Sequence, residues 1–402
     1  MKINRLLVRI FLITTFLTGC AAPAGNLAIS PEPPFASPTP TPFLPASDTP
    51  AAVSDTLTST ATQKATLIPT DTPASTATET ATLAPTGTPT PTPTPSRKVN
   101  LEAVGDIMLA RTVGDQVQAQ NPEIVFAGVQ SVLDSADVLI GNLECALTSG
   151  GERQPKSYPF AAPPETAQAL ALAGFDVLSL ANNHAMDYGY AGLQDTQSYL
   201  GLYNIATVGA GANAAKAHAP VILERNGLRL AFLAYVDVPE ENSGFDARTW
   251  TATASQPGIA WADPAQITTD VTAAKFKADL VIVLLHAGSE ITTVINNITN
   301  DQHLEAHTAI DAGAVLVIGS HPHVLQQIER YHGGLIAYSL GNFVFDQYKG
   351  VANATIILRV VLTPAGVQSY DWVPVLIENG LPRLSAEWEA PAIGTLVAPM
   401  NP

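Results

Sequence analysis

The sequence has 402 residues and a formal net charge of −16 at neutral pH, and only 13% of its residues are charged. This length suits one large domain or two small ones. The acidic balance argues against a nucleic acid as the partner, because nucleic-acid binding needs a basic surface.

The first 20 residues predict an export signal with a lipid attachment site. Lys2, Arg5 and Arg9 precede an apolar stretch that is too short to span a bilayer. Small residues stand directly before Cys20, as in a bacterial lipoprotein lipobox, so we expect Cys20 to become the lipidated first residue of the mature protein. Several acyl chains would anchor the protein stably, because each buried methylene contributes about 0.8 kcal/mol. The alternative is an ordinary signal peptide with an incidental cysteine.

Residues 21–98 are dominated by Pro, Thr, Ser and Ala. Such a segment lacks the apolar content that would offset its ordering entropy, and alternating Pro favours extended backbone. We therefore expect a disordered stalk that holds the folded part away from the membrane.

The folded part is expected over residues 99–381 as one domain, followed by a tail over residues 382–402 that has little pattern. Cys145 is the only cysteine besides the predicted lipid site, so no internal disulfide is expected. We interpret Cys145 as a small buried hydrophobic residue and not as a nucleophile.

Two apolar strands near the start of this domain end in acidic side chains. Asp106 follows the first predicted strand, and a strand over residues 137–140 leads to Asn142 and Glu144. Open α/β sheets place their sites at the carboxyl ends of the strands. The alternatives are a helix-capping role for Asp106 and a polar turn at Glu144.

A helix predicted over residues 165–173 precedes a third strand, residues 176–180, which leads to Asn183 and His184. An amide beside an imidazole suits a metal ligand next to an acid or base. Asp187 is close enough in sequence to orient the imidazole. The alternative is an Asn-rich turn before the next helix.

The middle of the domain contains a predicted hairpin and a fourth strand end. Asn226 and Gly227 form a strong turn signal within a hairpin over residues 221–235. A strand over residues 280–285 then ends at His286, and the alternative is a loop histidine that binds nothing.

His303 and His307 lie four residues apart on the next predicted helix and could share a metal ion. Glu305 falls between them at the wrong offset for a His-Glu-x-x-His motif. We therefore interpret them as part of a solvated helix face. A helix is also predicted near residues 122–133.

An apolar run over residues 314–318 is followed by Gly319 and then by His321 and His323. This pattern predicts a buried strand that delivers its carboxyl end to a site. Pro322 fixes its own φ, so both rings can be held at one sheet edge. The alternative is a pair of exposed loop histidines.

Side chains of metal-ligand type thus follow one strand after another, which is improbable as repeated accident. Mixed imidazole, carboxylate and amide ligands suit a divalent transition metal, Mn, Zn or Fe. The residues that follow strands in this way are Asp106, Glu144, Asn183 with His184, His286, and His321 with His323.

At these motifs the sequence resembles the CapA, or poly-γ-glutamate capsule synthesis, proteins, which are similar to calcineurin-like metallophosphoesterases. The matching strings occur in family order and span the domain: Gly105-Asp106-Ile107-Met108-Leu109, Asn142-Leu143-Glu144, Ala181-Asn182-Asn183-His184, Asp187-Tyr188-Gly189, His286 with Gly288 and Glu290, Gly319-Ser320-His321-Pro322-His323-Val324, and Tyr338-Ser339-Leu340-Gly341-Asn342-Phe343.

The resemblance implies an α/β fold, a four-layer α/β/β/α sandwich of two mixed sheets with the site at one edge. It implies that His184, held by Asp187, is the acid or base, and that six residues are metal-site positions, here called the candidate ligands: Asp106, Glu144, Asn183, His286, His321 and His323. Two positions depart from the pattern. Met108 stands where phosphoesterases carry a histidine, which argues against a full two-metal mechanism. Ala287 replaces an aromatic residue, and we expect it to reshape the pocket.

Three functions fit these observations. The first is an exported protein, lipid-anchored to the cell membrane and facing outward, that helps to make, export or trim an anionic polymer such as poly-γ-glutamate together with the capsule synthesis machinery. The second is a metal-dependent hydrolase of phosphoesters or amides. The third is a binding module that keeps a relic of the site.

An acidic domain repels a polyanion at long range, but screening limits this repulsion to about 8 Å. Local cations can therefore bind the polymer. Our candidates are Arg111, Arg153 and Lys156, together with the metal, and the alternative is that these side chains are ordinary surface charges.

Overall fold

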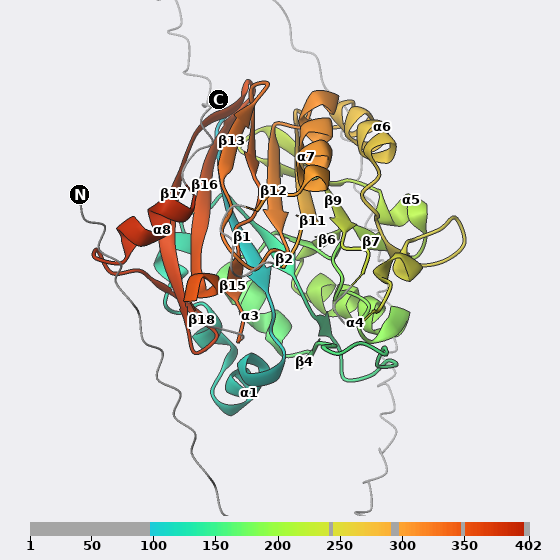
Figure 1. Cartoon of the computed structure of the whole chain (residues 1–402), viewed down its shortest axis with the longest axis vertical. Coiled ribbons are helices and arrows are strands. Elements are labelled where there is room, and N and C mark those ends of the chain that lie inside the picture. The colour runs from blue at the N-terminus through green and yellow to red at the C-terminus, as the bar shows by residue number, and fades with distance from the viewer. Residues whose placement is uncertain (1–96, 241–243, 291–296, 347–349, 398–402) are drawn as a thin grey trace, which may run out of the picture. The chain divides into compact units, whose positions relative to one another are not determined.

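The computed structural model describes residues 97–240, 244–290, 297–346 and 350–397 (Figure 1). The predicted export signal, Cys20 and the stalk up to residue 96 lie outside these residues. Among the helices that are described, none is both long enough and apolar enough to cross a bilayer.

The first sheet has eight strands and is centred on β1, which runs parallel to β2 and β15 and antiparallel to β16. Its strand order is β18-β17-β16-β1-β2-β5-β6, with β15 paired to β1. The strands are β1 (Val99–Ile107), β2 (Val138–Leu143), β5 (Val177–Ser179), β6 (Ala206–Val208), β15 (Asn342–Val344), β16 (Ala354–Thr363), β17 (Gly366–Glu378) and β18 (Leu381–Leu384).

The second sheet has six strands in the order β13-β14-β12-β11-β9-β8. The strands are β8 (Val221–Arg225), β9 (Leu228–Asp237), β11 (Leu280–Ala287), β12 (Leu316–Ser320), β13 (Ile328–Tyr331) and β14 (Gly334–Ala337). The predicted hairpin is confirmed as β8 and β9. Asn226 and Gly227 both have positive φ, 49° and 74°, as the mirror-image turn of a two-residue hairpin requires.

Alternation along β11 shows how this sheet is buried on both faces. Leu280, Ile282 and Leu284 pack in one core cluster with residues of the first sheet. Val281 and Val283 belong to a second core cluster, to which α6 (Pro264–Lys275) and α7 (Asn300–Ala312) contribute. Because side chains on a strand point alternately to opposite faces, the sheet is sandwiched between the first sheet and these helices.

The outer face of the first sheet is covered by α1 (Arg111–Ala119), α3 (Thr166–Ala173) and α4 (Gly189–Leu202), whose buried residues join the first core cluster. Figure 1 shows α6 and α7 beside the second sheet and the other three helices toward the opposite side. The fold is therefore the expected four-layer α/β/β/α sandwich of two mixed sheets. The shorter elements are β3 (Ala146–Leu147), β4 (Ala161–Ala162), β7 (Ala210–Gly211), β10 (Gly258–Ile259), α2 (Gln130–Leu133), α5 (Ala214–Ala217) and α8 (Ala390–Leu396).

The helix predicted over residues 122–133 is wrong. The structure has a 3-10 turn over Pro122–Val125 and a separate short α2, with Gly128 between them. A Cβ atom on Gly128 would lie 2.6 Å from the carbonyl oxygen of Pro382, and the amide of Leu384 donates to the carbonyl of Gly128 at 3.2 Å. Packing against β18 therefore interrupts the helix.

The folded part extends beyond both expected boundaries. The Arg97 guanidinium donates to the carbonyl of Gly227 at 2.8 Å and to Asp279 at 2.9 Å. At the other end, β18 pairs with β17, and α8 buries Ile393. Residues 381–397 are therefore part of the domain and not a patternless tail, because they cover one edge of the first sheet.

Candidate metal centre

The candidate ligands converge where the carboxyl ends of strands from both sheets meet. Asp106 on β1 lies in register with Asn142 on β2 and with Asn342 on β15. In the second sheet, His286 on β11 lies in register with Ser320 on β12. The structure brings all six predicted ligands to this place, and each is at most 6% exposed: Asp106, Glu144, Asn183, His286, His321 and His323.

One half of the site is built from Asp106, Glu144 and His323, which each offer a ligand atom within 4.8 Å of the others. His323 Nδ1 lies 3.4 Å from Asp106 Oδ2, and His323 Nε2 lies 3.7 Å from Glu144 Oε1. Asn142 Nδ2 donates to Asp106 Oδ1 at 2.8 Å. These contacts hold two carboxylates side by side around one imidazole.

The other half contains His286, Asn183 and His321. His286 Nε2 lies 2.9 Å from Asn183 Oδ1, and its Nδ1 lies 2.9 Å from the Ser320 hydroxyl. The rings of His286 and His321 have centroids 4.8 Å apart. The two halves meet at the loop after β12, which carries both His321 and His323.

Burial makes this arrangement electrostatically costly without a cation. Burial and the neighbouring Asp106 raise the pKa of Glu144 well above its ordinary value. Burial lowers the pKa of His286 to about 3 and that of His321 well below its ordinary value. For Asp106, burial alone would raise the pKa, but His323 and His286 outweigh it and lower the pKa. For His323, burial alone would lower the pKa, but hydrogen bonding to Asp106 and the charge of Asp106 outweigh burial and raise the pKa. The cluster therefore offers the neutral imidazoles of His286 and His321 beside the Asp106 carboxylate, and imidazoles bind metals in their neutral form.

Two ligand atoms of the cluster lack a hydrogen-bond partner in the part of the chain that the structure describes. Glu144 Oε1 and His321 Nδ1 are both buried and make no hydrogen bond there. Leaving a buried polar atom unsatisfied costs about 1 to 3 kcal/mol. Coordination to a divalent cation satisfies a buried ligand atom of this kind, and the imidazole, carboxylate and amide donors suit Mn, Zn or Fe. The residues present thus fit such an ion.

The backbone at this edge is strained and closely packed. His321 and His323 have φ values of 96° and 57°, in the left-handed region that residues with a Cβ atom rarely adopt. A Cβ atom on Gly319 would lie 1.9 Å from the carbonyl oxygen of Tyr338, so only glycine fits there. Strain of this kind persists where the surrounding structure enforces it, and it gathers at functional sites.

His184 lies beside the ligand cluster and is held by Asp187. Its Nδ1 is 2.7 Å from Asp187 Oδ2, and its Nε2 faces Glu144 Oε1 at 3.9 Å. The ring stacks on Phe160 with centroids 4.2 Å apart. Asp187 also accepts hydrogen bonds from the Phe160 amide at 2.6 Å and from Lys156 Nζ at 2.5 Å. This network fixes the tautomer that leaves Nε2 directed at the site.

The three predicted substrate cations lie in different surroundings. Lys156 is buried, with its side chain fully covered, and it pairs with Asp187 and donates to the carbonyl of Asn183. It thus supports His184 instead of facing a polymer. Arg111 pairs with Asp346, and its guanidinium lies 4.6 Å from the centre of the Phe160 ring. Arg153 is exposed, and no ion pair holds it within the described residues.

The two departures from the family pattern behave differently. Met108 is fully buried, and its sulfur accepts from the amide of Ala110 at 3.1 Å, so it turns back onto its own loop. Ala287 packs in the second core cluster, on the face of β11 opposite His286. The expectation that Ala287 reshapes the pocket is wrong, because its side chain points toward the helices. Cys145 is a buried acceptor for the Leu109 amide, and burial raises the pKa of its thiol to about 12.

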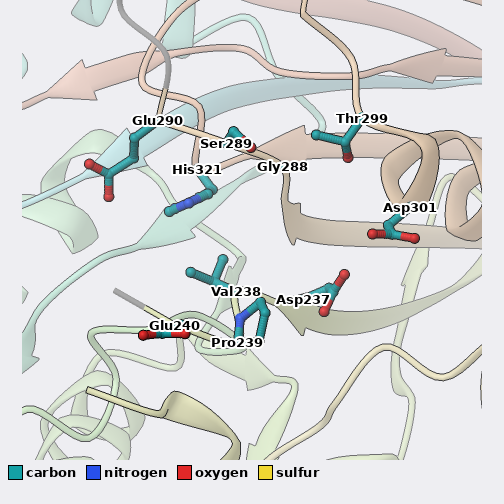
Figure 2. A pocket seen from close by; sticks show the side chains of 10 residues that line it. All are labelled: Asp237, Val238, Pro239, Glu240, Gly288, Ser289, Glu290, Thr299, Asp301 and His321. Carbon is teal, nitrogen blue, oxygen red and sulfur yellow. The ribbon is translucent and has the colours of Figure 1, made fainter. Parts of the chain in front are cut away.

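A pocket of about 430 Å³ opens beside His321. Figure 2 shows His321 between Glu290 and Val238, with Asp237 and Asp301 on the far side. Four carboxylates line this pocket: Asp237, Glu240, Glu290 and Asp301. The pocket is therefore strongly acidic next to the candidate metal centre.

Sequence reasoning did not assign several supporting residues that its own motifs contain. Asn342 Oδ1 lies 2.9 Å from His323 Nδ1, and Asn182 donates to Asn142 and accepts from the amide of His184. Glu290 has an oxygen within 4.8 Å of ligand atoms of His321 and His323. The sequence contained a signal for these residues, because they lie in the same motifs as the candidate ligands and are polar residues near strand ends.

Comparison with known proteins identifies the family. Residues 100–347 match the family described as "Bacterial capsule synthesis protein PGA_cap". The "PGA biosynthesis protein CapA" of Bacillus subtilis (strain 168) is 34% identical over 283 residues, which are 69% of this chain and 72% of that protein. The "Capsule biosynthesis protein CapA" of Bacillus anthracis is 35% identical over 296 residues, covering 72% of this chain and 70% of that protein.

Among solved structures, a hypothetical protein from Thermus thermophilus aligns with a TM-score of 0.44 and 17% identity, over 68% of this chain and 98% of that chain. This likeness is too distant to bear on function. The family match spans every candidate ligand, and the two Bacillus relatives each align over more than two thirds of this chain. The chain therefore belongs to the bacterial capsule synthesis family PGA_cap.

Proposed function

We propose that this chain is a lipid-anchored surface protein that serves the synthesis or export of poly-γ-glutamate, and that its site is a hydrolytic metal centre acting on the polymer. The capsule role is supported by the relatives, which are named for capsule and PGA biosynthesis. The anchor is supported by the basic and apolar N-terminus that ends at Cys20. The observation that carries the metal centre is the pair of orphaned buried atoms, Glu144 Oε1 and His321 Nδ1.

The predicted ligands would hold a divalent transition ion, which supplies Lewis-acid polarisation of the scissile group and activation of water. The chain's own acid is His184. Asp187 holds Nδ1, so Nε2 carries the proton exchange with the substrate. Amide hydrolysis needs this proton because the leaving amine is a poor leaving group until it is protonated. Phe160 stacks on the His184 ring and Lys156 pairs with Asp187, so both residues hold His184 and Asp187 in position.

The acidic pocket bears on how a polymer would enter. A chain of carboxylates is repelled by the pocket carboxylates of Glu240, Glu290 and Asp301, whereas its amino terminus is attracted. The exposed Arg153 is a cation that polymer carboxylates could contact, and Arg111 could do so where its guanidinium is not covered by Asp346. Trimming from the amino end is therefore the orientation that the charges favour.

The test is the chain length of purified poly-γ-glutamate after incubation with the full chain in Mn²⁺ or Zn²⁺. Wild type shortens the polymer, and His184→Gln does not. His218→Gln is the matched control, because His218 is a half-buried histidine paired with Asp270, outside the cluster. Unchanged polymer with metal-loaded wild type would reject the hydrolase. A deletion strain with normal amounts and lengths of extracellular polymer would reject the capsule role itself.

The orientation of Met108 favours a second candidate, a binding module that anchors polymer carboxylates on a partial metal site. Met108 supplies no imidazole, and its sulfur is engaged by its own loop. In this case His184→Gln leaves polymer binding and capsule formation intact, while Arg111→Gln and Arg153→Gln impair both. The opposite pattern would exclude the binding module.

A further inference from the structure

Two histidines that the sequence assigns to a solvated helix face instead form a compact cluster on the second sheet. His303 and His307 lie one turn apart on α7 and meet Glu329 from β13 and Tyr338, which directly follows β14. All of these except Tyr338 are partly exposed, and Tyr338 is buried. None of them belongs to the candidate metal centre.

The polar atoms of this cluster are close to one another. The Tyr338 hydroxyl lies 2.7 Å from His303 Nδ1, 3.2 Å from His307 Nε2 and 2.6 Å from Glu329 Oε2. His307 Nε2 lies 2.9 Å from Glu329 Oε2. His303, His307 and Glu329 each offer a ligand atom within 4.8 Å of the others, and the Tyr338 hydroxyl contacts all three residues.

We propose that His303, His307 and Glu329 form a second, structural zinc site, with the Tyr338 hydroxyl on its fourth side. Two histidines at i and i+4 present their rings on the same face of a helix. Two imidazoles and one carboxylate are typical protein ligands of Zn²⁺. A tetrahedral ion with bonds of about 2.1 Å separates its ligands by about 3.4 Å, so the four contacts given above would each need to lengthen by less than about 1 Å.

The ligands come from three parts of the fold, which gives the site a structural consequence. Zinc would link α7 to β13 and to the end of β14. His307 is already oriented, because its ring stacks on Tyr331 with centroids 3.7 Å apart and an interplanar angle of 6°. The first turn of α7 carries Asp301, which lines the acidic pocket, so this zinc would also hold one pocket wall in place.

Zinc binding is tested in a chain whose candidate metal centre is disabled by Asp106→Asn and His321→Gln. We expect this double variant to retain one zinc ion per chain, measured by mass spectrometry after dialysis, and to show a zinc-dependent rise in Tm. Adding Glu329→Gln should weaken zinc binding at least tenfold, because the amide keeps the shape and removes the charge. His303→Gln with His307→Gln should abolish it.

The matched control is His332→Gln, since His332 stacks on Tyr331 close to the cluster but is exposed and pairs with Asp311. It should leave zinc content unchanged. Circular dichroism confirms that each variant is folded, and Glu329→Gln serves as the decisive variant if the double histidine variant does not fold. The proposal is overturned if the disabled chain binds no zinc. It is also overturned if Glu329→Gln leaves the zinc affinity of the disabled chain unchanged.

Discussion

Asp187 hydrogen-bonds to His184 Nδ1 at 2.7 Å with one carboxylate oxygen, and its other oxygen accepts from a fully buried lysine. The acid of the proposed reaction is therefore positioned by a charge that no solvent reaches. His184, Asp187 and Lys156 are therefore important both for the proposed chemistry and for the stability of the fold.

Replacing Lys156 with methionine leaves the Asp187 charge buried without its counter-ion. We expect a loss of about 3 to 5 kcal/mol in the free energy of unfolding, measured by urea titration. The double variant Lys156→Met with Asp187→Asn should lose less, because the amide is neutral and still accepts from the Phe160 amide. If the double variant instead loses as much free energy of unfolding as the two single variants together, then the ion pair does not couple Lys156 and Asp187 energetically.

His184→Gln is expected to reduce the hydrolytic rate by about 10² to 10⁴, because a positioned acid contributes that much. The metal content of the protein should stay the same, since His184 is not one of the six candidate ligands and its Nε2 lies 3.9 Å from Glu144 Oε1. Rate and metal content are measured on the same preparation. A parallel fall in both would instead make His184 a ligand.

The stability of the domain should depend on pH through Glu305. This side chain is 4% exposed, and burial, followed by Asp237 and Asp301, raises its pKa to about 9. Between its unfolded pKa near 4.5 and about 9, the folded state holds more protons than the unfolded state. The free energy of unfolding therefore falls as pH rises through this window, by up to about 1.4 kcal/mol per pH unit.

Glu305→Gln imitates the protonated form and should flatten this part of the pH profile, with the variant more stable than wild type at pH 8 to 9, within that window. Denaturant titrations at several pH values give the comparison. Parallel profiles for the two proteins would show that Glu305 is not the titrating group.

His321 allows a test of backbone strain that separates it from ligand loss. Both His321→Ala and His321→Gly remove the orphaned Nδ1, but only glycine accepts the φ of 96° without penalty. Left-handed backbone costs about 1 to 2 kcal/mol per residue, and glycine's added entropy costs about 0.5 to 1 kcal/mol. We expect the metal-free glycine variant to be more stable than the alanine variant by about 1 kcal/mol, with metal binding weakened equally in both. An alanine variant of equal or greater stability would contradict the strain.

Local patterns predicted the elements that depend on local physics. Asn226-Gly227 specified its hairpin through positive φ values, and Gly174 ends α3 with a φ of 88° as a left-handed cap. The apolar runs that stop at Asp106, His286 and His321 were visible because buried strands need β-branched residues and sites need polar ones. The convergence of these strand ends at one place could therefore be predicted from the sequence, and the role of their side chains as metal ligands stays a prediction.

Features that depend on distant partners could not be predicted. Lys156 reads as a surface cation in sequence, and only its neighbours across the fold bury it against Asp187 and Trp250. The helix predicted at residues 122–133 fails because Gly128 packs against Pro382, which lies far later in the chain. His303 and His307 were assigned to solvent because Glu329 and Tyr338 join them only through β13 and β14.

The central strand of the first sheet takes its neighbours from opposite ends of the domain: β2 begins at Val138, whereas β15 and β16 lie after residue 341. The His321 amide reaches back across 215 residues to donate to Asp106. A chain that emerges from its N-terminus, during synthesis or export, thus carries Asp106 and Glu144 long before their partners arrive. If the centre holds the proposed metal ion, ion binding would for that reason be a late event in folding, and it would take place in the compartment where the last strands fold.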